Sequence, residues 1–299
     1  MSEEVWPALP WKEWEPTATT LHMWTQIVGK TRLTLFPLQA HWWNVTLYVS
    51  PCGLTTAAMP VEGGNLEIEF DFLAHDLHFR LSDGRTKRMK LNPRSVADFY
   101  REYLETLRKI GVQVKINLMP CELKEPIRFD EDTVHASYDP EFVQRFWRIL
   151  MRTSTLFQRF SSEFLGKVSP AHFFWGSFDL AVTRFSGRRA PERPGADAIQ
   201  REAYSHEVIS AGFWPGNGGF GEAAFYAYAA PSPEGLDRAK IGPASAYFDK
   251  TLGEFVLKYD DLRRETSPDD ALMEFLQSTY AAAADAAKWD RKALERLAA

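Results

Sequence analysis

The sequence carries one set of features twice, and this duplication limits the possible folds more than any other pattern. Ala40-His41-Trp42-Trp43 resembles Ala171-His172-Phe173-Phe174. Five positions further along match at one constant offset, namely Pro60, Gly63, Gly64, Glu67 and Phe70 against Pro215, Gly218, Gly219, Glu222 and Phe225. A repeat this long indicates duplication of a domain rather than a solenoid. Two such units can pair their sheets edge to edge or pack them face to face, and a site often forms between them.

Local patterns inside each half predict a helix, several antiparallel strands and a second helix. The expected helices are 17–32, 92–110, 140–165 and a last one from 267 onward. The expected strands are 39–50, 54–59, 66–72, 77–81, 85–91, 112–118, 171–184, 205–213, 222–229 and 254–262. The sequence therefore predicts an α+β fold of two helix–antiparallel sheet–helix units, with the sheets covered by helices.

The expected organisation has three parts. The first repeat is 1–120, and it starts with an extended Trp- and Pro-rich arm over residues 1–16, because closely spaced prolines disfavour a helix. A polar connection follows at 121–140, and the second repeat is 141–299. We expect the second repeat to carry the functional site, because its copy of the shared strand holds more polar side chains.

Composition narrows the classes of function. Hydrophobic residues make up 45% of the 299 residues, and the net charge of −5 argues against a nucleic-acid surface. The short basic run at 85–90 is typical of a solvated strand. Cys52 and Cys121 match neither a disulfide framework nor a paired-cysteine motif, so both are expected as free thiols. No apolar run approaches the ~20 residues of a membrane span, and we expect a soluble cytoplasmic protein.

The segment 171–184 mixes large aromatic rings with polar side chains. A solvent-exposed strand would not have so many rings, and a core strand would not have His, Asp and Arg. Read as one strand, its alternation places Phe173, Trp175, Ser177 and Asp179 on one face, as a ring-lined wall with a hydroxyl and a carboxylate. Arg184 would lie at the strand's end. An alternative for this region is that Asp179 only pairs with an arginine. A second alternative is an anion held by a loop, with the arginines Arg184, Arg188, Arg189 and Arg193.

The segment 204–219 holds the second group of candidates. His206 is a candidate general acid or base. Glu207 is its neighbour in a strand and points to the other face, so Asp179 or Glu222 is the better partner. The glycine-rich run 216–219 predicts a hairpin rather than a phosphate loop, because no helix follows it.

These arguments give a defined set of candidate residues. The catalytic candidates are His206 and Asp179. The binding candidates are His41, Trp43, His172, Trp175, Ser177, Arg184, Arg188, Trp214, Asn217 and Glu222. No cofactor and no metal are expected, since the histidines lack the spacing of a metal motif. Whether His41 and His172 share one site stays open, although equivalent strands would bring them towards one axis.

Three segments carry a resemblance to a known family: 39–56 (QAHWWNVTLYVSPCGLTT), 169–188 (SPAHFFWGSFDLAVTRFSGR) and 205–219 (SHEVISAGFWPGNGG). They resemble an uncharacterised bacterial family that is catalogued only as a domain of unknown function, over nearly the whole chain. The resemblance implies a single full-length module in bacteria. It implies no activity and no catalytic residues.

The sequence thus leads to two hypotheses. The first is a protein that binds a small polar or sugar-like molecule in an aromatic-lined pocket, with acid–base catalysis by histidine and carboxylate. The alternative is a non-catalytic protein-interaction or structural module. Either way, we expect no nucleic-acid partner and no membrane partner, and the oligomeric state stays open.

Overall fold

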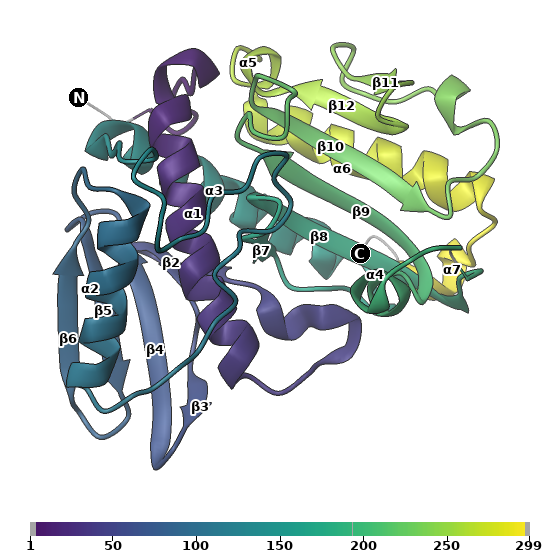
Figure 1. Ribbon diagram of the computed structural model, residues 1–299. Helices are drawn as coiled ribbons and strands as arrows, with labels where there is room; N and C mark the ends of the chain where they lie inside the picture. Colours follow the sequence, from purple (N-terminus) through teal and green to yellow (C-terminus); the bar gives the residue numbers. More distant parts are fainter. Residues whose placement is uncertain (1–3, 193, 297–299) are drawn as a thin grey trace.

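Two antiparallel sheets and their helices make up the protein (Figure 1). The computed structural model describes residues 4–192 and 194–296, so Arg193 and the first three residues of the expected arm lie outside the described part. The first half contains α1 (Trp11–Leu35), η1 (Ala40–Val45), β1 (Tyr48–Val49), β2 (Gly53–Thr55), β3 (Met59–Val61), β4 (Gly64–Asp71), β5 (Asp76–Leu81), β6 (Thr86–Lys90) and α2 (Val96–Lys109). The second contains α3 (Pro140–Ser162), β7 (His172–Phe174), β8 (Asp179–Arg189), α4 (Ala198–Ala203), β9 (His206–Trp214), β10 (Ala224–Ala230), η2 (Leu236–Arg238), β11 (Tyr247–Asp249), β12 (Glu254–Lys258), α5 (Tyr259–Leu262), α6 (Pro268–Ala286) and α7 (Arg291–Leu294). The expected α+β fold is confirmed.

Sheet 1 has the strand order β1-β2-β4-β5-β6, with β3 paired to β4. In β4 the alternation is as predicted: Leu66, Ile68 and Phe70 are buried, and the acidic residues between them are partly exposed. The buried side chains join the core beneath α1 and α2, and α2 lies over one face of the sheet in Figure 1. The opposite face of sheet 1 is therefore the polar one.

Sheet 2 has the order β11-β12-β10-β9-β8-β7. Alternate residues of β8, such as Leu180 and Val182, join the hydrophobic core with the buried residues of α3 and α6. In Figure 1, α6 lies behind sheet 2, and the other face of β9 and β10 is turned to the viewer. The long helices α3 and α6 thus pack on one face of sheet 2, whereas Trp43 of η1 and Tyr204, which follows α4, pack on the other.

The two sheets meet edge to edge, which is one of the two packings that the duplication allowed. Leu47, just before β1, and Phe173 of β7 exchange two backbone hydrogen bonds of 2.9 Å. One hydrophobic core contains residues of both halves. The repeat boundaries at 120 and 140 stay a prediction. The described chain between α2 and α3 contains no helix or strand, so the strand expected at 112–118 is wrong.

The first helix begins earlier than expected. α1 starts at Trp11 and contains Pro16, so the extended arm predicted over residues 1–16 is wrong for its last six residues. The side chain of Trp14 is fully buried, and its indole donates a hydrogen bond of 3.2 Å to the Pro215 carbonyl. We infer that this packing against the second half stabilises a turn that Pro16 alone would disfavour.

Four strand predictions fail because the chain turns where alternation suggested extension. The strand expected at 54–59 is divided between β2 and β3, with Ala57 at φ 51° between them. Residues 40–45 form a 3-10 segment in which His41 and Trp42 have φ values of 60° and 61°. The segment 171–184 is a hairpin rather than one strand, because Phe178, with φ 59°, donates its N–H to the Phe174 carbonyl at 2.8 Å. The strand expected at 254–262 ends at Lys258, where α5 begins.

The helix signals near prolines hold better. Asp139 caps α3 as expected by accepting hydrogen bonds from the first-turn N–H groups of Glu141 and Phe142. α6 begins at Pro268, as predicted, whereas α2 begins after Ser95 rather than after Asn92. Among the described residues, no helix has both the length and the apolar character that a membrane crossing needs.

Candidate functional site

The face of sheet 2 turned away from α6 carries an unusual set of side chains. Residues that are paired across neighbouring strands share a face, and the registers place one set on it: His172 and Phe174 of β7, Asp179, Ala181, Thr183 and Phe185 of β8, Val208, Ser210, Gly212 and Trp214 of β9, and Tyr226 and Tyr228 of β10. Its middle consists of small residues, and its two ends carry rings and ionisable groups. We call this surface, which lies opposite α6, the open face. Most of its side chains are nevertheless buried, and Trp43 and Tyr204 pack against the end that carries Phe185 and Val208.

Asp179 occupies one end of the open face. Its side chain is buried, with 4% of the residue's surface exposed, and it accepts hydrogen bonds from the hydroxyls of Ser177 and Tyr226. Within the described chain no Lys, Arg or His forms an ion pair with it. Burial raises the pKa of the carboxyl from 3.8 to about 6, although both hydroxyl hydrogen bonds act in the opposite direction. Asp179 is therefore a buried acid that titrates close to neutrality.

Two further carboxyls lie within electrostatic range of Asp179. Burial, together with the smaller effect of the Asp179 charge, raises the pKa of Glu254 to about 7. The same two causes, in the same order, raise the pKa of Glu122. Because three acids repel one another here, they cannot all be ionised without a large cost. This end of the open face can therefore hold and release protons near pH 7.

Stacked rings lie beside these acids. The ring of Trp214 stacks on Tyr226 at a centroid distance of 4.3 Å, and Tyr226 stacks on Tyr228 at 6.1 Å. Gly212 permits this arrangement, because a Cβ there would lie only 2.3 Å from the ring carbon and the hydroxyl oxygen of Tyr226. The Tyr226 ring thus lies flat on the strand, and its hydroxyl reaches Asp179.

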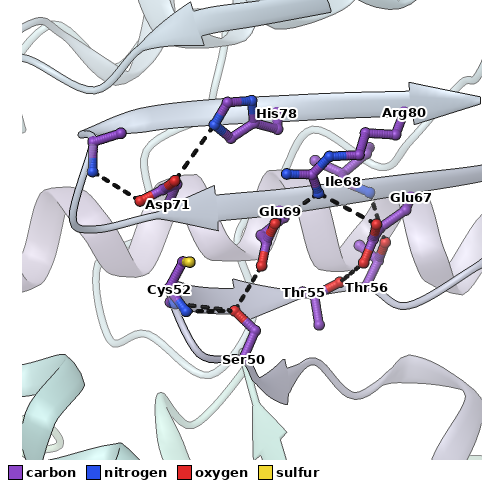
Figure 2. Close-up of polar contacts among 12 residues, drawn as sticks. Ser50, Cys52, Thr55, Thr56, Glu67, Ile68, Glu69, Asp71, His78 and Arg80 are labelled. Carbon is purple, nitrogen blue, oxygen red and sulfur yellow. Dashed lines mark hydrogen bonds and ion pairs between the residues drawn. The ribbon is translucent and has the colours of Figure 1, made fainter. Parts of the chain in front are cut away.

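The polar face of sheet 1 shows what an ordinary solvated sheet surface looks like in this protein. Figure 2 shows Arg80 of β5 reaching both Glu67 and Glu69 of β4, at 3.3 and 2.6 Å. Ser50 donates a further hydrogen bond to Glu69, and His78 lies 3.6 Å from Asp71. Carboxylates there have basic partners, whereas Asp179 has only hydroxyls.

The structure brings three other predicted binding residues to Asp179. Ser177 donates to it directly, and Asn217 donates a hydrogen bond of 2.6 Å to the Ser177 carbonyl. Trp214 belongs to the stack on Tyr226. Trp175 does not belong to this group, because the hairpin turn directs its indole to the Val45 carbonyl, at 2.6 Å, and against Gly29 of α1. The predicted wall of Trp175, Ser177 and Asp179 on one strand face is therefore wrong.

His206 is far from Asp179, so the expected pairing of these two residues is wrong. They lie near opposite ends of the β8–β9 pair, where Arg189 is opposite His206 and Leu180 is opposite Phe213. At about 3.3 Å per residue the separation along the strands exceeds 20 Å. Glu222, the alternative partner, forms an ion pair of 2.8 Å with Lys258 instead. The alternation of residues within one strand could not predict this separation, because the register between strands decides which residues lie near His206 and Glu222.

The predicted histidines instead gather at the second end of the open face. The ring of His41 lies 5.6 Å from His206 and 5.6 Å from Trp43, and Trp43 lies 5.4 Å from His172. His41 and His172 thus contact one shared tryptophan, near the junction of the two sheets. Asp179 was expected as the carboxylate partner of His206. Among the described residues, no carboxylate takes that place in this group.

Neither predicted arginine lies at a site entrance. Arg184 points to the helix side of sheet 2, where its guanidinium lies 3.4 Å from the Phe160 ring centroid and 4.3 Å from that of Tyr280. Arg188 forms an ion pair of 2.6 Å with Glu207 and donates to the Ala287 and Lys288 carbonyls. Both hold elements together, and their assignment as ligand contacts stays a prediction.

Four residues on or beside the open face were missed by the sequence arguments: Glu122, Tyr226, Tyr228 and Glu254. The alternation of Tyr226 and Tyr228 with alanines in 224–230 was a usable signal for a ring-bearing face. Glu122 comes from the irregular chain between α2 and α3, and its contact with Gly176 depends on the tertiary fold.

A hollow on α2 does not compete with the open face. It has a volume of about 540 Å³ and is lined by Asn92, Arg94, Asp98, Arg101, Glu102 and Glu105. Its charged groups neutralise one another, since Arg94 pairs with Glu102 and Arg101 with Asp98. In the part of the chain that the structure describes, no three His, Cys, Asp or Glu side chains are arranged to hold a metal ion.

The open face therefore combines stacked aromatic rings with buried carboxyls whose pKa values are raised. No curated protein matches the chain, and no solved structure matches it. One family model does match, and it covers residues 6–296. Because this match spans almost the entire sequence, the chain belongs to the family of unknown function DUF5996.

Proposed function

We propose that the protein binds a small polar, sugar-like molecule on the open face, with Asp179 exchanging a proton with it. The observation that carries the proposal is a buried carboxyl without a basic partner beside a ring stack. A buried unpaired acid costs stability, so its position is better explained by chemistry than by folding.

The ligand class follows from the groups available. Trp214 is partly exposed and offers a ring face, on which the C–H side of a sugar-like ring packs well. The carboxyls of Asp179, Glu122 and Glu254 accept hydrogen bonds from hydroxyls when ionised and donate them when protonated. With the pKa of Asp179 raised to about 6 and that of Glu254 to about 7, both forms are populated near neutrality.

The test is ligand-induced thermal stabilisation with a panel of monosaccharides and polyols. A ligand at one hundred times its Kd stabilises the folded state by about 2.7 kcal/mol. We expect at least one compound to stabilise the wild type, and Trp214→Ala to lose this stabilisation. Trp147→Ala is the matched control, because Trp147 lies on α3 and its indole donates to the Ser50 carbonyl, away from the open face.

Two results would overturn the proposal. One is the absence of stabilisation by every compound, which would favour the alternative of a non-catalytic interaction module. The other is equal stabilisation of the wild type and Trp214→Ala. A bacterial and cytoplasmic setting also stays a prediction from the sequence.

A further inference from the structure

The second end of the open face forms a basic cluster of its own, made by Lys167, His41, His206, Trp43 and Phe185. The Lys167 ammonium lies 5.1 Å from the Trp43 ring centroid and 5.0 Å from that of Phe185. His41 packs on Phe185 at 4.6 Å and on His206 at 5.6 Å. A cation and two imidazoles thus share one aromatic support.

His41 is held in a defined tautomer. Its Nδ1 lies 3.1 Å from the Glu202 carbonyl oxygen and 3.2 Å from that of Ala203, at the end of α4. Carbonyls only accept hydrogen bonds, so Nδ1 carries the proton and Nε2 has a free lone pair. The backbone that presents this ring is left-handed at both His41 and Trp42. Two consecutive strained residues are uncommon, and such strain is concentrated at functional positions.

No ion pair in the described part of the chain balances the charge of this cluster. Among the described residues, Lys167 forms no ion pair, and burial lowers its pKa without an opposing carboxylate. Burial also lowers the pKa of His41, and the charge of Lys167 lowers it further. Beside the cluster, His172 is 1% exposed, and its Nδ1 has no hydrogen-bond partner in the described chain. The Lys167 ammonium forms no ion pair with a described residue, so a bound anion would balance its charge.

We propose that Lys167, His41 and His206 form a binding site for a small oxyanion, separate from the Asp179 end of the open face. Lys167 supplies the charge, and His206 donates a hydrogen bond to the oxyanion. The lone pair on His41 Nε2 accepts the proton of a monoprotonated oxyanion such as hydrogen phosphate. Asp179 and Phe185 are about 20 Å apart along β8, so this site does not depend on the proposed function.

The experiment is a titration of the full chain with inorganic phosphate, followed through the imidazole signals in the NMR spectrum. The protein has seven histidines, so the His41 and His206 signals can be assigned by single substitutions. We expect saturable shifts of both signals in the wild type. In Lys167→Met we expect phosphate to bind at least about tenfold more weakly. Lys115→Met is the matched control, since Lys115 is an exposed lysine in the chain between α2 and α3.

A parallel titration with acetate distinguishes the sources of the oxyanion. Saturable binding of both probes supports a general oxyanion site, and saturation by phosphate alone supports a site for phosphate groups. No saturable shift with either probe would overturn the proposal, as would equal phosphate binding by the wild type and Lys167→Met. Lys167 is exposed, so its substitution is not expected to unfold the protein.

Discussion

Replacing Asp179 by asparagine should stabilise the protein at neutral pH, although it removes a buried, hydrogen-bonded carboxylate. Each pKa unit is worth about 1.4 kcal/mol, so a rise from 3.8 in the unfolded chain to about 6 in the folded protein costs about 3 kcal/mol once the group is ionised. The amide is neutral at every pH and keeps the shape of the carboxyl. Its oxygen can still accept from Tyr226, and its NH2 can donate to Ser177.

The sign of the pH dependence follows from proton binding. Between pH 3.8 and about 6 the folded protein binds more protons at Asp179 than the unfolded chain does. The contribution of this group to the free energy of unfolding therefore falls as the pH rises through that window, and it stays low above it. Asp179→Asn lacks this loss, so its advantage over the wild type should grow by about 2.4 kcal/mol between pH 4 and pH 7.5.

The assay is urea unfolding of the wild type and Asp179→Asn across this pH range. Asp76→Asn is the control, because Asp76 is 2% exposed but lies 2.8 Å from the Lys90 ammonium. That variant should lose about 1 kcal/mol at pH 7.5, the opposite sign. Parallel pH profiles for the wild type and Asp179→Asn, or a less stable Asp179→Asn at pH 7.5, would refute the reasoning.

Substitutions at three further positions test the packing by urea unfolding. Gly212→Ala should lose about 1–3 kcal/mol because its Cβ would lie 2.3 Å from the Tyr226 ring, and the loss should shrink in a Tyr226→Ala background. Gly29→Ala should also destabilise, although alanine normally favours a helix by about 1 kcal/mol, because its Cβ would lie 2.2 Å from Trp175. Arg184→Met should change stability by less than about 1.5 kcal/mol. Burial disfavours the charged guanidinium and lowers its pKa to about 10, and methionine keeps the apolar packing. Arg184→Ala, which removes that packing, should lose about 2–5 kcal/mol.

Much of the fold could be predicted because its signals are local. The alternation of β4 and the cap of α3 by Asp139 depend on residues within a few positions of each other. The errors occur where a distant contact decides the conformation. Trp14 is fixed to Pro215, and His41 is fixed to the end of α4, so neither the early start of α1 nor the left-handed turn could be read locally.

The candidate site was predictable only in part, for the same reason. Asp179, Ser177, Trp214 and Asn217 were identified from residue type, and they do come together. The partners of Asp179 were not predicted, because Tyr226 reaches it across two strand pairings and Glu254 comes from a further strand. His206 was assigned to the wrong end of the open face, since its strand register decides which end it occupies.

The single bridge between Leu47 and Phe173 has a consequence for assembly. An edge strand with free N–H and C=O groups is a template on which other chains add strands. Here each half closes part of the other's edge, so the junction makes these two facing edges less available for pairing with other chains, while β6 and β11 remain edge strands. Separated halves would each expose that edge and much of a shared apolar core. We therefore expect them to aggregate alone and to reassemble with each other when refolded together.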